Sequence, residues 1–258
     1  MDTELWIRTA LAIALLAAIA LAGLRAFRVA APWEVVIAIL RAAVQLALLS
    51  VVLAGLIQDV RWVALGLLVM LVAAVLTAAR RGRGASAPLP LLAVAIVAGP
   101  LTAMLVVFGT GAVGITPEYL LAVGGIVIGN AMTMAILVQR VLHASIDDHW
   151  DEVEGWLALG ATPRQSIATL ARGAVRTALL PAIDQTRTTG IVVLPGAFVG
   201  AVFAGLSPLE AGRFQLIVLA SILAAGVVTA TILAFAPIRS SASRAAPARA
   251  FDSGEAKA

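Results

Sequence analysis

Long apolar segments are the feature of this chain that most restricts its fold. Seven of them run for about 20 residues with few or no charges, which is the length a helix needs to cross a hydrocarbon core of ~30 Å. Because lipid offers the backbone no hydrogen-bond partner, such segments cross a membrane as helices. We therefore predict an all-α, polytopic membrane helix bundle. The expected spans are 5–24, 34–57, 61–79, 89–109, 119–142, 183–205 and 213–236.

The composition agrees with a membrane protein and excludes several other classes. Hydrophobic residues make up 62% of the 258 residues and charged residues 12%, far from the roughly 45–50% and 25% of soluble domains. The basic residues are spread over short loops, so we expect a lipid bilayer and no nucleic acid as the partner. The absence of cysteine excludes disulfides and cysteine-ligated metal centres. We expect residues 1–258 to form a single transmembrane domain.

The distribution of arginine predicts the orientation of the chain. Loops on the cytosolic side of a membrane carry an excess of Arg and Lys. An N-terminus outside the cytosol and a cytosolic C-terminus satisfy this rule, because the opposite loops then hold little beyond Arg61 and Arg213. The tail, residues 238–258, has too little apolar surface to fold, and we expect it to be disordered in the cytosol. The cytosolic basic segments are 25–28, 80–83, 143–182 and 239–257.

Residues 143–180 form the one sizeable polar insert, between the fifth and sixth spans, and they predict two cytosolic helices. Ser145 and Asp148 have the spacing of a capping box, so the first helix is expected to begin there. Apolar residues at helical spacing form one stripe, and acidic residues cover the remaining face. The stripe is Ile146, Trp150, Val153 and Leu157, and the acids are Asp147, Asp148, Asp151, Glu152 and Glu154.

The sequence also predicts where the insert turns. Gly160 is a plausible left-handed stop for the first helix, and Thr162, Pro163 and Gln165 supply an N-cap, a first-turn proline and a reciprocal Gln for the second, which should run to about Leu180. Acidic helices are repelled by an anionic leaflet, which favours a protein partner for the insert. The alternative is a solvated acidic face whose apolar stripe packs on the bundle.

Six polar or helix-breaking residues at membrane depth are candidates for a translocation path. Arg41 would lie about 12 Å into the core, where a charge needs a partner or water, although it could also reach the cytosol or pair with Glu34. Asn130 lies mid-span and could bond a neighbouring helix or contact substrate. Pro195 removes a backbone donor and should bend or break its helix. The candidates are Arg41, Gln45, Asn130, Thr133, Pro195 and Gly196.

Residues that could hold a metal ion or perform catalysis are few. His143 and His149 stand among acidic residues, but their spacing matches no known metal motif, so a solvated surface is the favoured interpretation and any metal site stays unassigned. Asp184 and Arg187 are one turn apart and could form an ion pair. Intramembrane proteolysis is disfavoured because both histidines lie in the polar insert and no His-Glu-x-x-His motif is present.

Four separated motifs resemble one known family. They are residues 32–34 (PWE) with 41–46 (RAAVQL), 128–132 (IGNAM), 159–165 (LGATPRQ), and 190–196 (GIVVLPG) with 204–211 (AGLSPLEA). Over nearly its whole length the chain resembles the Fet-type iron-export permeases, which are related to plant aluminium-tolerance permeases. It departs from them at 188–190 and 197–201, where more methionine and a glutamine are expected, and this weakens the case for a methionine-based metal path.

The resemblance implies a permease of an ATP-binding-cassette transporter, dimeric, in the bacterial cytoplasmic (inner) membrane. It implies iron or other metal export driven by a separate cytosolic ATPase, which binds ATP and magnesium, while this chain binds no cofactor. The printed sequence has no phosphate-binding loop and one lysine, Lys257, so this chain is expected not to be an enzyme. The coupling residues are expected to be Glu154, Gly160, Ala161, Thr162, Pro163 and Arg164.

Two other classes of function fit the residues. A self-sufficient secondary transporter or channel would use Arg41 as its coupling group and the insert as a regulatory arm. A membrane scaffold without transport activity fits less well. A neighbouring gene for an ATPase with Walker motifs separates these alternatives from the first, since only an ATP-driven permease requires one.

Overall fold

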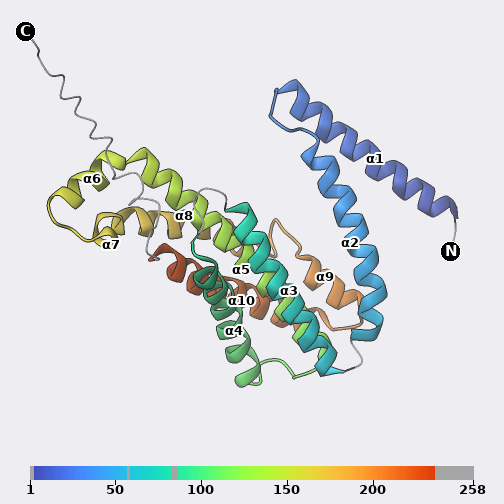
Figure 1. Cartoon of the computed structure of the whole chain (residues 1–258). Helices are drawn as coiled ribbons and strands as arrows, with labels where there is room; N and C mark the ends of the chain where they lie inside the picture. Colours follow the sequence, from blue (N-terminus) through green and yellow to red (C-terminus); the bar gives the residue numbers. More distant parts are fainter. Residues whose placement is uncertain (1–2, 57–58, 83–86, 236–258) are drawn as a thin grey trace, which may run out of the picture. The chain divides into compact units, whose positions relative to one another are not determined.

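The computed structural model describes residues 3–56, 59–82 and 87–235, and in these ranges the chain is helical without strands (Figure 1). It divides into two compact units, Met1–Trp62 and Val63–Ala258. The predicted all-α class is therefore confirmed. The tail that we expect to be disordered, 238–258, lies outside the described residues.

The first unit consists of α1 (Thr3–Ala26) and α2 (Glu34–Leu56), which contact each other. In the connection between them, Arg28 and Ala31 have positive φ angles of 53° and 55°. The Arg25 guanidinium lies 4.5 Å from the centroid of the Trp33 ring, which is a cation–π contact. Among the described side chains, no residue of this unit is buried.

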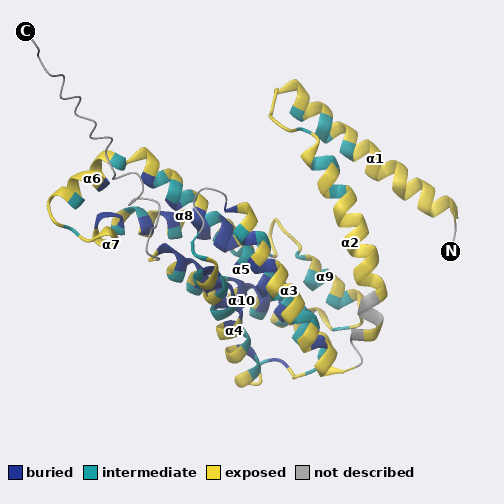
Figure 2. Ribbon diagram, in the orientation of Figure 1, coloured by how far each residue is buried: buried dark blue, intermediate teal, exposed yellow. Residues whose placement is uncertain are grey.

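The second unit has its core where α10 (Pro208–Ala234) packs against α4 (Leu89–Gly109), α5 (Pro117–Asp148) and α8 (Ala168–Thr188). Buried residues concentrate on these helices (Figure 2). Small residues allow the close approach: a Cβ on Gly99 of α4 would lie 2.5 Å from the Ala225 carbonyl oxygen of α10. A hydrogen bond links the same two helices: the Thr229 hydroxyl of α10 donates to the Ala95 carbonyl of α4 at 3.1 Å.

α3 (Val60–Arg81) completes the packing around α5, with Val63, Ala74, Val75 and Ala78 buried. Its Leu67 side chain approaches Gly124 so closely that a Cβ there would lie 2.8 Å from Leu67 Cδ2. The remaining helices of the unit are short. They are α6 (Trp150–Ala158), α7 (Pro163–Ser166) and α9 (Gly196–Phe203).

Six described helices are long and apolar enough to cross a membrane, against the seven spans predicted. Six expected spans each correspond to one of these helices. The expected span 183–205 is not a continuous helix, because α8 ends at Thr188 and α9 begins only at Gly196. The Thr188 carbonyl accepts bonds from the Val192 and Val193 amides in a turn, Gly190 has φ +84°, and Pro195 offers no amide. The predicted break near Pro195 is confirmed, and the chain is already non-helical from 189.

The predicted start of the insert is wrong. Ser145 does not cap a new helix, because its carbonyl accepts the His149 amide at 3.2 Å and α5 continues to Asp148. The second predicted helix is also different: after the single turn of α7, α8 begins at Ala168 and continues past Leu180, where we expected the helix to end, and through Pro181. Tertiary packing explains both results, since Leu142 and Ile146 of α5 are buried in the same apolar cluster as Ala171 and Ala174 of α8.

Candidate functional site

The turn between α6 and α7 has the geometry that its sequence predicts. Gly160 adopts φ +88°, in the left-handed region that side chains other than glycine rarely occupy. Thr162 and Gln165 form a complete capping box: the Thr162 amide donates to Gln165 Oε1 at 2.8 Å, and the Gln165 amide donates to the Thr162 hydroxyl at 3.4 Å. These local bonds hold the turn in one conformation.

The apolar stripe of the insert, which runs from the end of α5 into α6, packs against the core of the second unit. Ile146 and Val153 are buried, and Trp150 and Leu157 are half-buried against the core of the second unit. The packing of the stripe on the bundle is therefore confirmed, and it leaves open whether a partner binds the outer face of the insert. The acidic residues of this segment consequently face outward, and all five of them are exposed.

A groove of about 530 Å³ opens beside the turn, between α6 and the start of α8. Two large apolar side chains at this groove are exposed: Trp156 is 50% exposed and Leu159 is 83% exposed. The lining residues are Glu152, Trp156, Leu159, Gly160, Ala161, Gln165, Ser166, Thr169 and Leu170. α6 and α7 lie at one end of the second unit, beyond the ends of α5 and α8 (Figure 1).

The expected coupling residues share this turn. Gly160 and Ala161 line the groove, whereas Glu154, Thr162, Pro163 and Arg164 are exposed around it. Sequence reasoning missed Trp156, Leu159 and Thr169. A signal for the first two was present, because both apolar residues lie off the inward stripe and so had no place in the core.

The expected path residues Asn130 and Thr133 line a second pocket, of about 140 Å³, where α5, α8 and α10 meet. The Asn130 amide donates to the Ile126 carbonyl at 2.8 Å and the Thr133 hydroxyl to the Gly129 carbonyl at 3.1 Å. Both bonds stay within α5, so among the described residues Asn130 does not form the interhelical bond that was one of its two predicted roles. Gln185 of α8 lines the same pocket and was not among the predicted residues.

The other expected path residues belong to α2 and to the start of α9. Arg41 and Gln45 are exposed on α2, and among the described residues Arg41 has no ion pair or hydrogen bond, including with Glu34. Pro195 precedes α9 as its N-cap and Gly196 is the first residue of that helix. The structure therefore brings Asn130 and Thr133 together in the second unit, whereas Arg41 and Gln45 belong to the first unit, which is described by itself.

The two histidines of the insert each contact a residue one turn away in α5. His143 Nε2 lies 3.5 Å from an Asp147 carboxylate oxygen, and His149 Nδ1 lies 3.0 Å from the Ser145 carbonyl oxygen. Among the residues that the structure describes, no three His, Cys, Asp or Glu side chains gather in a way that could hold a metal ion.

Two buried amides were also missed by the sequence analysis. Gln139 of α5 accepts the Ala87 amide at 2.9 Å through Oε1 and donates to the Ala135 carbonyl at 2.8 Å, which attaches the start of α4 to α5. Gln215 of α10 is 5% exposed, and its Oε1 has no hydrogen-bond partner among the described residues. Gln139 is structural, and nothing in the structure explains Gln215.

The apolar helices and their packing define a multi-pass membrane protein of the helical-bundle class. The chain belongs to the family described as "Uncharacterised protein family (UPF0014)", whose family model matches residues 6–241. This agrees with the resemblance read from the four motifs.

Several relatives carry names of their own. The rice "UPF0014 membrane protein STAR2" is 34% identical over 77% of this chain and 70% of its own length. The Arabidopsis "Protein ALUMINUM SENSITIVE 3" is 31% identical over 76% of this chain and 72% of its length. The Escherichia coli "Probable iron export permease protein FetB" is 34% identical over 49% of this chain and 48% of its length. No solved structure matches the chain.

Proposed function

We propose that this chain is the permease subunit of an ATP-binding-cassette transporter that exports a metal ion, and that the α6–α7 turn docks onto a separate cytosolic ATPase. ATP and magnesium bind to that partner. Support for transport comes from membership of a family that includes a relative named as a probable iron export permease. The structural support comes from the groove beside Gly160.

The observation that carries the proposal is the exposure of Trp156 and Leu159 beside an acidic surface. Large apolar side chains at the rim of a groove are typical of a binding surface. Insertion into an anionic leaflet is opposed by the acidic residues around them, such as Glu152 and Glu154. A protein partner can cover the apolar side chains and also tolerate the acidic surface around them. Burial of each apolar side chain in such an interface contributes about 1.5–3 kcal/mol to binding.

The packing of the insert provides a route by which a partner could move the membrane helices. Val153 of α6 and Ile167, just before α8, are buried in the same apolar cluster as α5 and α8. Close-packed helices move as bodies because their interiors do not compress. A displacement of the turn is therefore passed to α5 and α8, which meet again at the Asn130 pocket.

The remaining features of the transporter follow from the same proposal. The docking turn must be cytosolic, and with the arginine distribution this favours an N-terminus outside and a C-terminus on the cytosolic side of the membrane. This orientation requires α8 and α9 together to make a seventh crossing beside the six long apolar helices. A homodimer is the expected assembly, and the exposed Gly200 of α9 allows close packing against a second copy. The cargo is iron or another metal ion, by analogy with the named relative.

Co-purification tests the docking. The tagged chain is expressed with an ATPase encoded beside its gene, and recovery of the ATPase, its hydrolysis rate and metal flux in vesicles are measured. Leu159→Asp should reduce recovery and stimulation. Leu209→Asp is the matched control, because Leu209 is 86% exposed in the first turn of α10. Equal loss in both variants, or metal flux without any ATPase, contradicts the proposal and favours a self-sufficient transporter.

A further inference from the structure

The C-terminal part of α8 lies at the level of the middle of the membrane. α5 carries no charge between Glu118 and Arg140, a segment of ~32 Å that matches a hydrocarbon core of ~30 Å. Asn130 is near the middle of that segment. Gln185 of α8 lines the same pocket as Asn130, and so does Ile222, which is near the middle of the charge-free part of α10.

A second set of contacts places the C-terminal part of α8 at the same depth in the membrane. A Cβ on Gly226 of α10 would lie 3.1 Å from Met134 Cε of α5 and 3.6 Å from Leu179 Cδ2 of α8. Gly226 and Met134 both belong to the central parts of their helices. Because Leu179 is at this level and the helix continues to Thr188, the last two turns of α8 run through the centre of the bilayer.

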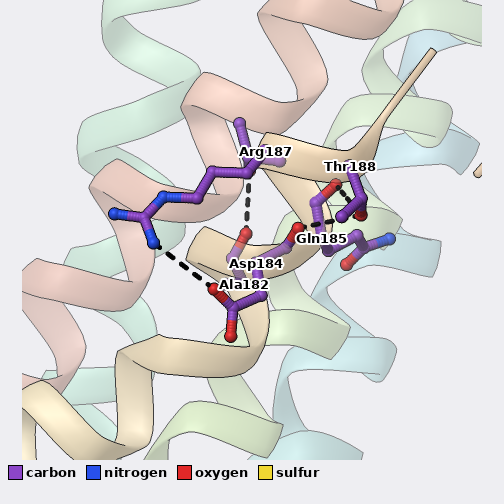
Figure 3. A network of polar contacts seen from close by, with 6 residues as sticks. Ala182, Asp184, Gln185, Arg187 and Thr188 are labelled. Carbon is purple, nitrogen blue, oxygen red and sulfur yellow. Dashed lines mark hydrogen bonds and ion pairs between the residues drawn. The ribbon is translucent and has the colours of Figure 1, made fainter. Parts of the chain in front are cut away.

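These turns are polar and their charged side chains are exposed. Arg187 Nη1 lies 3.6 Å from Asp184 Oδ1, and the two side chains are 73% and 63% exposed (Figure 3). This confirms the ion pair predicted from the sequence, but places it at the end of α8. The Thr188 hydroxyl donates to the Asp184 carbonyl at 2.9 Å, and the Thr189 hydroxyl donates to the Gln185 carbonyl at 2.7 Å.

Non-helical backbone follows immediately. After Thr188 the chain forms a turn in which the Gly190 amide donates to the Val193 carbonyl at 2.9 Å, and α9 begins at Gly196. Irregular backbone at membrane depth occurs where it is buried in protein or lines a water-filled cavity, and charged side chains follow the same rule. Exposed charges and a broken helix at one level are thus two independent indications that this face does not contact lipid.

We propose that the end of α8 and residues 189–195 line a water-filled path, in which Asp184 and Arg187 are the charge pair that a hydrophilic ion meets at the centre of the membrane. Leu180 and Arg176 lie about two and three turns before Arg187 and continue the same face toward the insert. The path itself does not depend on the partner ATPase. The sign of the ion does rest on the proposed function: for a metal cation, Asp184 attracts the ion and Arg187 compensates the carboxylate when no ion is present.

Cysteine accessibility tests the path, and the chain suits it because its sequence contains no cysteine. Leu180→Cys and Arg187→Cys are made in the full chain and exposed to a membrane-impermeant sulfonated thiol reagent, in right-side-out and inside-out membrane vesicles, with and without ATP. The controls are Leu101→Cys, on an exposed apolar position near the middle of α4, and Ala178→Cys, on the buried face of α8. Reaction in denaturant verifies that each thiol is intact.

The expected result is modification of both α8 variants in at least one vesicle orientation, with the two controls unreactive until denaturation. If Arg187→Cys fails to insert, Leu180→Cys carries the test alone, because it removes no charge. Lack of reaction at Leu180→Cys in both orientations, with and without ATP, overturns the proposal. Modification in a chain that neither recruits nor stimulates an ATPase leaves the path standing and contradicts only the proposed function.

Metal flux then tests the roles of the two charges. Asp184→Asn should lower the flux of a divalent metal cation several-fold, whereas Arg187→Gln should leave it unchanged or raise apparent affinity, because only the second variant keeps the carboxylate. A structural ion pair predicts equal losses in both variants, since each breaks the same contact. If both variants lose metal flux equally and also yield less folded chain, the roles assigned to Asp184 and Arg187 are wrong.

Discussion

The conformation of the α6–α7 turn makes a quantitative prediction, because two glycines close together in the sequence differ in backbone geometry. Gly160 has φ +88°, where an alanine is strained by roughly 1–2 kcal/mol. Gly155 lies inside α6, and an added Cβ meets no atom within 4 Å, so alanine there stabilises the helix by roughly 0.5–1 kcal/mol. Gly160→Ala and Gly155→Ala should thus change the local stability of α6–α7 in opposite directions.

Hydrogen exchange of the amides in α6 and α7 measures this difference, because it reports the free energy of local opening. With 1.4 kcal/mol per tenfold change, Gly160→Ala should speed exchange by about tenfold and Gly155→Ala should slow it by a few-fold. Amides of α10, far from the change, serve as an internal reference. Equal exchange in the two variants would refute the claim that the left-handed residue fixes this turn.

Three further predictions concern the core of the second unit, each measured as the thermal stability of the chain in detergent. Gly99→Ala should destabilise by roughly 1–3 kcal/mol, since its Cβ would press on the Ala225 carbonyl, and unchanged stability would contradict the close crossing. Gln139→Leu should cost roughly 1–3 kcal/mol by leaving the buried Ala87 amide without its acceptor. Gln215→Leu should instead be neutral or stabilising, because its buried Oε1 has no partner to lose; a loss comparable to that of Gln139→Leu would reveal an unseen bond.

The parts of the structure that depend on local chemistry were predictable from the sequence. Six spans follow from apolar length alone, because backbone groups in lipid have no other partner than their own helix. The left-handed Gly160 and the capping box of Thr162 and Gln165 were also predictable, because each depends only on residues no more than three positions apart.

The errors arose where tertiary packing competes with local patterns. Ser145 has an acceptable capping sequence, yet Ile146 is buried beside α8, and this contact favours continuing α5 over starting a new helix. The second helix was expected to end near Leu180, but α8 continues through Pro181, because a proline in a membrane helix is tolerated when neighbouring helices hold the chain in place. The meeting of Gln185 with Asn130 could not be predicted, because it depends on how α8 pairs with α5.

Photo-crosslinking from the docking turn tests the central claim most directly. A photoreactive amino acid replaces Leu159 at the groove and, as the control, Leu209 at the start of α10, in cells that express the transporter at natural levels. The account predicts that Leu159 captures an ATPase subunit and that Leu209 does not. Capture of only lipid or the chain's own helices from Leu159, in cells where metal export is active, contradicts it.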